Sequence, residues 1–84
     1  MSYEIRFTRQ AAKDAQKLSP KLQDKLKTLL RGEIAQNPHR GKPLMGDLKG
    51  YYAVRLNRKD RLVYAIDEAA NVVVILRAKS HYGD

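Results

Sequence analysis

The sequence predicts a small α+β domain in which one strand and two helices precede three consecutive strands. Near the start of the chain and again from residue 51 onward, apolar and polar side chains alternate with the period of a half-buried strand. Between these stretches, leucines recur at helical spacing. Because short turns separate the last three strands, we expect an antiparallel meander in a mostly antiparallel sheet, with both helices on one of its faces.

The first strand is expected over residues 2–8, where three apolar residues alternate with charged ones. Thr8 is a candidate N-cap because its hydroxyl can accept a hydrogen bond from a free amide of the first helical turn. Alanines and Leu18 then follow at helical spacing. This pattern predicts a short first helix that ends before Ser19.

A second helix is predicted over residues 20–36. Ser19 and Pro20 are a typical start, since serine caps a helix and proline is tolerated at its first position. Leucines and Ile34 mark one apolar stripe, with lysines and arginines outside it. The helix should end at Asn37, because a residue before proline is disfavoured in the helical conformation.

The three final strands are expected from residue 51 onward, with turns at residues 57–60 and 67–71. A weaker, shorter strand is expected around residues 43–48. Both faces of the final strands are largely apolar, whereas each helix has a single apolar stripe. The helices should therefore cover one face of the sheet and leave the other for function or for a partner.

Length and composition restrict the class of protein. Eighty-four residues make one domain, residues 1–84, with a thin core. The chain has no cysteine and two histidines, so we expect no disulfide framework, no metal site and no cofactor. No apolar stretch suits a secretion signal or a membrane span, which favours a cytoplasmic protein without membrane association.

Positive charge is spread along the whole chain. Seventeen lysines and arginines against nine aspartates and glutamates give a formal net charge of +8. A distributed excess of this size attracts polyanions such as nucleic acid, anionic lipid or an acidic protein. Nucleic acid or an acidic protein partner is therefore favoured.

The last predicted strand ends in basic and titratable side chains. Counting alternate residues predicts that one face of this strand carries Val73, Ile75, Arg77, Lys79 and His81. Tyr82 follows directly. Arg55 and Arg61 flank the turn at residues 57–60, and their side chains converge if both point to the same face.

Such a set of residues suits cleavage of RNA by its own 2′-hydroxyl group. That reaction needs a base for the hydroxyl, cations around the phosphorus and an acid for the departing 5′-oxygen, and it needs no metal ion. Histidine titrates near neutral pH, arginine binds phosphate through two donors, and tyrosine stacks on bases. Spacing alone leaves another interpretation open, in which the histidine is merely exposed and the arginines protect a sheet edge.

Three short segments keep a characteristic order along the chain: Leu48-x-Gly50-Tyr51, the Arg-Leu-Val-Tyr run at residues 61–64, and the pair His81-Tyr82. In this order they resemble the RelE superfamily of bacterial toxins, most closely its Txe/YoeB branch, and the likeness covers nearly the whole chain. The resemblance implies a RelE-like fold and a toxin of a type II toxin-antitoxin system. It also implies a ribosome-dependent endoribonuclease that cuts mRNA in the A site and is inhibited by a cognate acidic antitoxin.

The resemblance assigns roles to individual residues. Arg61 matches the arginine that stabilises the scissile phosphate, His81 the general acid or base, and Tyr82 the aromatic residue that places the nucleotide. Arg55 matches a basic position that contacts the phosphate. Lys79 occupies a basic position shortly before the histidine.

The general base is where this sequence departs from the Txe/YoeB branch. That branch has a glutamate at the position of Lys42, and Asp47 is the nearby carboxylate here. Three interpretations remain: Asp47 takes the role from a shifted loop, His81 does the proton transfer itself, or Lys42 and Lys49 act as in the basic site of the RelE branch. The last two are favoured. The candidate substrate-binding residues are Lys42, Lys49, Arg77 and Lys79.

Two other functions stay open. One is a ParE-like toxin that inhibits gyrase by binding, although such sequences generally lack the terminal His81-Tyr82 pair. The other is a non-catalytic basic binding module. In each toxin reading, a partly disordered acidic partner fits a chain of charge +8, because its carboxylates would reach the arginines.

Overall fold

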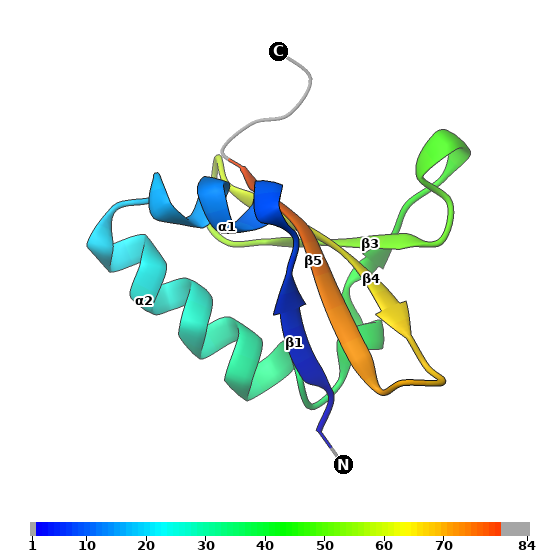
Figure 1. Ribbon diagram of the computed structural model, residues 1–84. Helices are drawn as coiled ribbons and strands as arrows, with labels where there is room; N and C mark the ends of the chain where they lie inside the picture. The colour runs from blue at the N-terminus through cyan, green and yellow to red at the C-terminus, as the bar shows by residue number, and fades with distance from the viewer. Residues whose placement is uncertain (1, 80–84) are drawn as a thin grey trace.

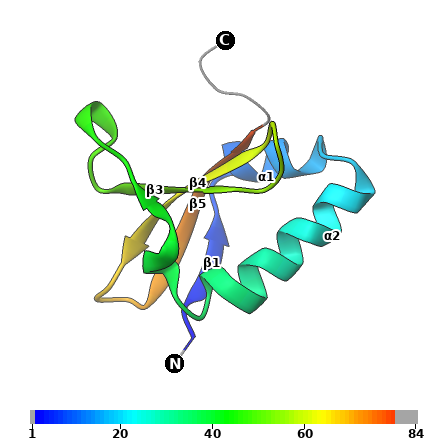
Figure 2. The same ribbon diagram turned by 180° about the vertical axis from the view of Figure 1, so that it is seen from behind.

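Residues 2–79 form a five-stranded sheet with two helices on one face (Figures 1 and 2). The computed structural model describes these residues, the last of them by its backbone. The elements are β1 (Glu4–Phe7), α1 (Arg9–Gln16), α2 (Pro20–Leu29), β2 (Lys42–Pro43), β3 (Tyr51–Arg55), β4 (Arg61–Asp67) and β5 (Val72–Lys79). The strand order is β1-β5-β4-β3-β2, with β1 parallel to β5 and the other pairs antiparallel. The predicted α+β class is confirmed.

Both helices begin where the capping residues predict. The Thr8 hydroxyl accepts a hydrogen bond from the Ala11 amide, and the Ser19 hydroxyl accepts one from the Leu22 amide. A π-helical turn, Leu30–Ile34, continues α2 almost to its predicted end. Within the described part of the chain, no helix has the length and apolar character needed to cross a membrane.

The segment before β3 differs from its prediction. Instead of a strand around residues 43–48, β2 comprises Lys42–Pro43, and a 3-10 turn spans Gly46–Leu48. Gly46 and Gly50 have φ angles of 68° and 98°, a backbone conformation that glycine adopts without steric cost. These glycines turn the chain out of the sheet, and the loop of residues 44–50 projects from it (Figure 1).

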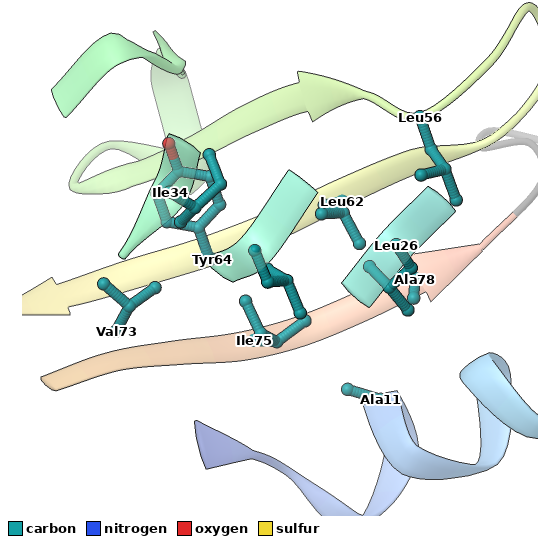
Figure 3. Close-up of a cluster of buried hydrophobic side chains, with 10 residues drawn as sticks. Ala11, Leu26, Ile34, Leu56, Leu62, Tyr64, Val73, Ile75 and Ala78 are labelled. Atoms are coloured by element: carbon teal, nitrogen blue, oxygen red, sulfur yellow. The ribbon is translucent and has the colours of Figure 1, made fainter. Parts of the chain in front are cut away.

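The core lies between the helices and one face of β4 and β5 (Figure 3). Leu62 and Tyr64 of β4 are register partners of Ala78 and Ile75 of β5, and each of the four side chains is at most 1% exposed. The helical segments contribute Ala11, Leu26, Leu30 and Ile34. Burial of these apolar surfaces stabilises the domain and fixes which face of the sheet remains open.

A β-bulge changes the predicted alternation in β5. Val63 pairs with Arg77, but the next residue of β4, Tyr64, pairs with Ile75, so Leu76 is the additional residue. Val73 and Ile75 therefore face the helices, whereas Arg77 belongs to the opposite face. The prediction that Val73, Ile75, Arg77 and Lys79 share one face is wrong, because a strict period of two does not continue through a bulge.

Candidate functional site

Rows of register partners cross the face of the sheet opposite the helices. In one row, Arg55 of β3 pairs with Arg61 of β4, which pairs with the backbone of Lys79 in β5. The neighbouring row runs over four strands and consists of Lys42, Ala53, Val63 and Arg77. Because register partners leave the same face of a sheet, basic residues from four strands lie at neighbouring positions. We call this set the cationic face: Lys42, Arg55, Arg61 and Arg77.

A cavity of about 240 Å³ opens on the cationic face. Its lining residues are Lys42, Ala53, Val54, Arg55 and Arg61. None of them is acidic, and Ala53 occupies little of the space between the basic side chains. A concave site lined by one sign of charge focuses the electrostatic field and attracts anions. We call it the cation-lined cavity.

Arginine at two of these positions suits a phosphate ligand in particular. The guanidinium group is planar, stays charged, and presents paired donors that match two phosphate oxygens. Arg55 and Arg61 come from adjacent strands of one hairpin and are exposed to solvent. Two neighbouring groups of this kind are chemically suited to an anion such as a phosphodiester.

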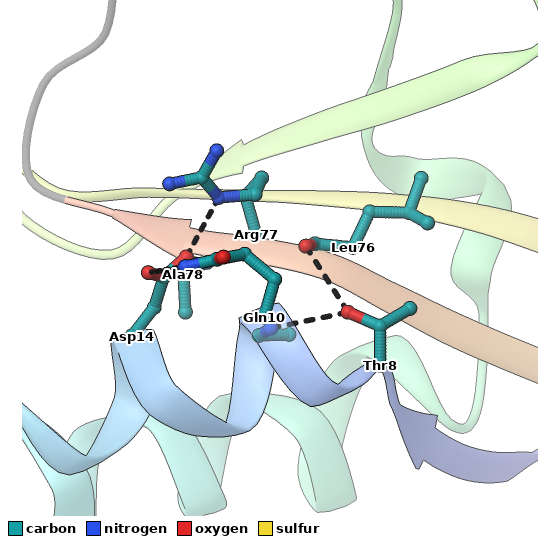
Figure 4. Close-up of polar contacts among 7 residues, drawn as sticks. Thr8, Gln10, Asp14, Leu76, Arg77 and Ala78 are labelled. Atoms are coloured by element: carbon teal, nitrogen blue, oxygen red, sulfur yellow. Dashed lines mark hydrogen bonds and ion pairs between the residues drawn. The ribbon is translucent and has the colours of Figure 1, made fainter.

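Arg77 lies beside this cavity rather than in its lining. As the residue two before Lys79, it is a diagonal neighbour of Arg61, at the spacing of about 7–8 Å that is usual for such positions. Its Nε donates to Asp14 Oδ2 of α1 at 2.8 Å (Figure 4). An acidic residue distant in sequence thus contacts the edge of the cationic face.

Asp14 is held by several donors. Its carboxylate also accepts hydrogen bonds from the Ala78 amide at 3.1 Å and from Gln10 Nε2 at 3.0 Å, and its side chain is 6% exposed. Burial raises the pKa of Asp14, but the hydrogen bonds from Arg77, Gln10 and Ala78 outweigh it, so this pKa lies below its usual value. A carboxylate whose pKa is lowered, and whose oxygens already accept from three donors, is a weak general base.

The position of Asp14 follows from the way α1 completes an edge of the sheet. β1 ends at Phe7, and β5 continues beyond it. The Thr8 amide still donates to the Ile75 carbonyl at 3.0 Å, and the Thr8 hydroxyl donates to the Leu76 carbonyl at 3.3 Å. Asp14, further along α1, then receives the Ala78 amide. Sequence analysis missed Asp14, because an acidic residue on a short polar helix usually marks a solvated surface.

The structure separates some of the predicted site residues. Lys42 lines the cation-lined cavity, whereas Asp47 and Lys49 belong to the projecting loop of residues 44–50 and are not among its lining residues. His81 and Tyr82 lie outside the described residues, as does the side chain of Lys79. The predicted convergence of Arg55 and Arg61 on one face is present.

Three further hollows among the described residues differ in their chemistry. One, of about 370 Å³, lies beside α1, and carboxylates of Asp14 and Asp60 line it together with Arg77. A groove of about 370 Å³ between α2 and β1 is mainly apolar, with Ile5, Phe7, Leu26 and Leu30 in its lining. A wider hollow of about 610 Å³ lies between α2 and the end of β3; it contains basic residues, but there Glu33 forms an ion pair with Arg40. The cation-lined cavity is thus the more suitable place for a phosphate group.

Comparisons with known proteins agree on one family. The family of ParE-like toxins of type II bacterial toxin-antitoxin systems matches residues 5–83. Toxin RelG of Mycobacterium tuberculosis is 38% identical over 92% of this chain and 88% of its own length. Toxin RelE of the same organism is 41% identical over 88% of this chain and 76% of its own length.

Solved structures give the same result. A chain of the toxin-antitoxin complex RelBE2 from Mycobacterium tuberculosis superposes with a TM-score of 0.88 at 35% identity, over 96% of this chain and 100% of that one. A chain of the heterotetrameric YoeB-YefM toxin-antitoxin complex from Staphylococcus aureus gives a TM-score of 0.77 at 32% identity, over 98% and 100%.

Proposed function

Because this chain belongs to the ParE-like toxins of type II toxin-antitoxin systems, and among them to the RelE/YoeB toxins, we propose that it is an endoribonuclease that cleaves mRNA in the ribosomal A site. The family confirms the resemblance seen in the sequence. The observation that carries the proposal is the cation-lined cavity, where Arg55, Arg61 and Lys42 from three strands surround one space. The reaction is growth-inhibiting because it stops translation.

The chemistry is transesterification within the RNA. The 2′-oxygen of the nucleotide attacks the adjacent phosphorus, a 2′-oxygen–phosphorus bond forms, and the bond from phosphorus to the 5′-oxygen breaks. The products are a 2′,3′-cyclic phosphate and a free 5′-hydroxyl. Negative charge accumulates on the phosphate oxygens in the transition state, and Arg55 and Arg61 stabilise it there with preorganised donors.

Proton transfer is assigned to two groups. His81 donates the proton that the departing 5′-oxygen requires, since imidazole titrates near neutral pH. Lys42 stands where the Txe/YoeB branch has its glutamate, and no carboxylate is found among the described residues that line the cavity. The surrounding cations stabilise the 2′-alkoxide instead, so that water is sufficient to accept the 2′-hydroxyl proton while His81 acts as the acid.

The partner that restrains this activity is an acidic antitoxin. The chain carries a net charge of +8, and its cationic face is uncovered by its own helices. Relatives of this chain were solved in complexes with antitoxins, which supports such a partner. An antitoxin segment with carboxylates would neutralise Arg55 and Arg61 and exclude RNA. Both proteins would act in the cytoplasm, where ribosomes are found.

The direct test is cleavage of a defined mRNA on purified, programmed ribosomes. We expect the wild-type protein to cut in the A-site codon and leave a 2′,3′-cyclic phosphate. His81→Ala should lower the cleavage rate about 10²- to 10⁴-fold, the usual contribution of a positioned acid or base. Intact mRNA with the folded wild-type protein would refute the proposal, and a DNA-supercoiling assay would then test inhibition of gyrase.

A further inference from the structure

We propose that Asp14 is a positioning residue that holds Arg77 in the orientation in which it binds the RNA backbone. This inference rests on the endoribonuclease function proposed above. Asp14 belongs to α1, lies against β5 and does not line the cation-lined cavity. Asp14 does not touch RNA in this proposal, and it acts only through the guanidinium group of Arg77.

The contact between the two residues is specific in its geometry. Asp14 accepts from Nε of Arg77 at 2.8 Å, and the two terminal nitrogens of the guanidinium group point away from α1 (Figure 4). Arginine has five N–H donors, of which Nε carries one. With Nε engaged, the terminal nitrogens retain the paired donors that match two phosphate oxygens. The contact therefore determines which edge of Arg77 is presented.

Asp14 is more deeply buried than Arg77, as its role as a positioning residue requires. The Asp14 side chain is 6% exposed, and the Arg77 side chain is 40% exposed. Gln10 and the Ala78 amide fix the carboxylate from two other directions. A rigid, buried acceptor thus holds a partly exposed cation. Because an arginine side chain loses much conformational freedom when it binds a ligand, holding it in advance lowers that cost.

The location of Arg77 makes such an orientation useful. It shares a row with Val63, Ala53 and Lys42, and it lies diagonally next to Arg61. If Arg61 binds one phosphate of the RNA backbone, the next phosphate would lie within reach of Arg77 along this row. Arg77 would then contact the RNA beside the scissile group and hold it in register for the attack.

Asp14 also has a structural contact, so the experiment must separate its effect on folding from its effect on the orientation of Arg77. Its Oδ2, the oxygen that accepts from Arg77 Nε, also accepts from the Ala78 amide, so Asp14 binds the backbone of β5 as well as the Arg77 side chain. A structural effect of Asp14 would persist after Arg77 is removed, whereas a positioning effect would vanish. A double-mutant cycle distinguishes these cases.

The test measures single-turnover mRNA cleavage at saturating programmed ribosomes. The proteins compared are the wild type, Asp14→Asn, Arg77→Ala and the double variant. We expect Asp14→Asn to slow cleavage about tenfold to a hundredfold, as misplacement of a binding group does. In the Arg77→Ala background, the same change should have no further effect. Asp24→Asn is the matched control, because it makes the same chemical change at an exposed position of α2.

Thermal unfolding of each variant accompanies the kinetics. If Asp14→Asn fails to fold, Asp14→Glu takes its place, since it keeps the charge but moves the carboxylate by one methylene. An Asp14 variant that cleaves like the wild type would overturn the positioning role, as would one whose loss is equally large without Arg77. Absence of cleavage by the wild type would overturn the proposed function itself, and with it this role.

Discussion

Arg55 and Arg61 are direct register partners across the β3–β4 hairpin, and both line the cavity that Lys42 also lines. The turn between them is well fixed. The Leu56 amide donates to the Asp60 carbonyl at 2.8 Å, and Asn57 Oδ1 accepts from the Asp60 amide at 2.6 Å. The hairpin backbone therefore holds the two arginines at paired positions beside one cavity.

Replacing either arginine should reduce cleavage without unfolding the protein. We expect Arg55→Ala and Arg61→Ala each to lower the single-turnover rate about 10²- to 10³-fold, the usual loss when a donor to the transition state is removed. Both residues are exposed, so thermal unfolding should change little. Lys59→Ala is the control, since it removes a positive charge from an exposed position of the same turn. An equal loss in that variant would show that net charge, and not position, matters.

The structure distinguishes between Lys42 and Lys49, two candidate site residues that the sequence could not rank. Lys42→Met should slow cleavage at least tenfold, because Lys42 lines the cavity, and a positioned cation lowers the barrier of this reaction by at least that amount. Lys49→Met changes the net charge equally but lies in the projecting loop, and should have a small effect. Measurement at saturating ribosomes removes differences in electrostatic steering. A larger loss for Lys49→Met would place the site on that loop.

Two glycines should respond in opposite directions to alanine. A Cβ at Gly41 would clash with the Tyr64 hydroxyl, which donates to the Pro38 carbonyl at 2.6 Å inside the core. Gly41→Ala should therefore cost about 1–3 kcal/mol, the penalty of a buried polar group that loses its partner. A Cβ at Gly32, in the π-helical turn, would meet no atom within 4 Å, so Gly32→Ala should stabilise the protein by up to about 1 kcal/mol. Urea unfolding of both variants checks this, and equal effects would contradict it.

Acid should weaken the contribution of Asp14 to stability. Its pKa is lower in the folded protein than in the unfolded chain, so its contribution is present above the unfolded value, near about 4, and is lost as the pH falls through the folded value. The difference in unfolding free energy between the wild type and Asp14→Asn should therefore shrink in this acidic range. Urea unfolding at pH 7 and at several values below 4 measures it.

Asp24→Asn provides the comparison for the acid experiment, because it makes the same chemical change at an exposed position of α2. Its effect on stability should vary much less with pH over the same range. If the two variants showed the same dependence on pH, general charge repulsion in acid would explain the result, and the network around Asp14 would not be its source.

Local patterns in the sequence determined both helices, most of the strands and the pairing of Arg55 with Arg61. Thr8 and Ser19 begin helices because each accepts a hydrogen bond from an amide three residues later. Leu62 and Tyr64 face the core because strand side chains alternate. The convergence of Arg55 and Arg61 was predictable for the same reason, since only a short turn separates their strands. These features depend on neighbours within a few residues.

The tertiary structure alone decided the rest. The bulge at Leu76 results from how β4 and β5 pair along their whole length, and it moves Arg77 to the cationic face. The ion pair between Arg77 and Asp14 joins residues 63 positions apart, and it exists because α1 completes the edge of β5 where β1 ends. Such contacts depend on how remote segments meet when the chain closes on its core. Residue spacing contains no direct record of that closure.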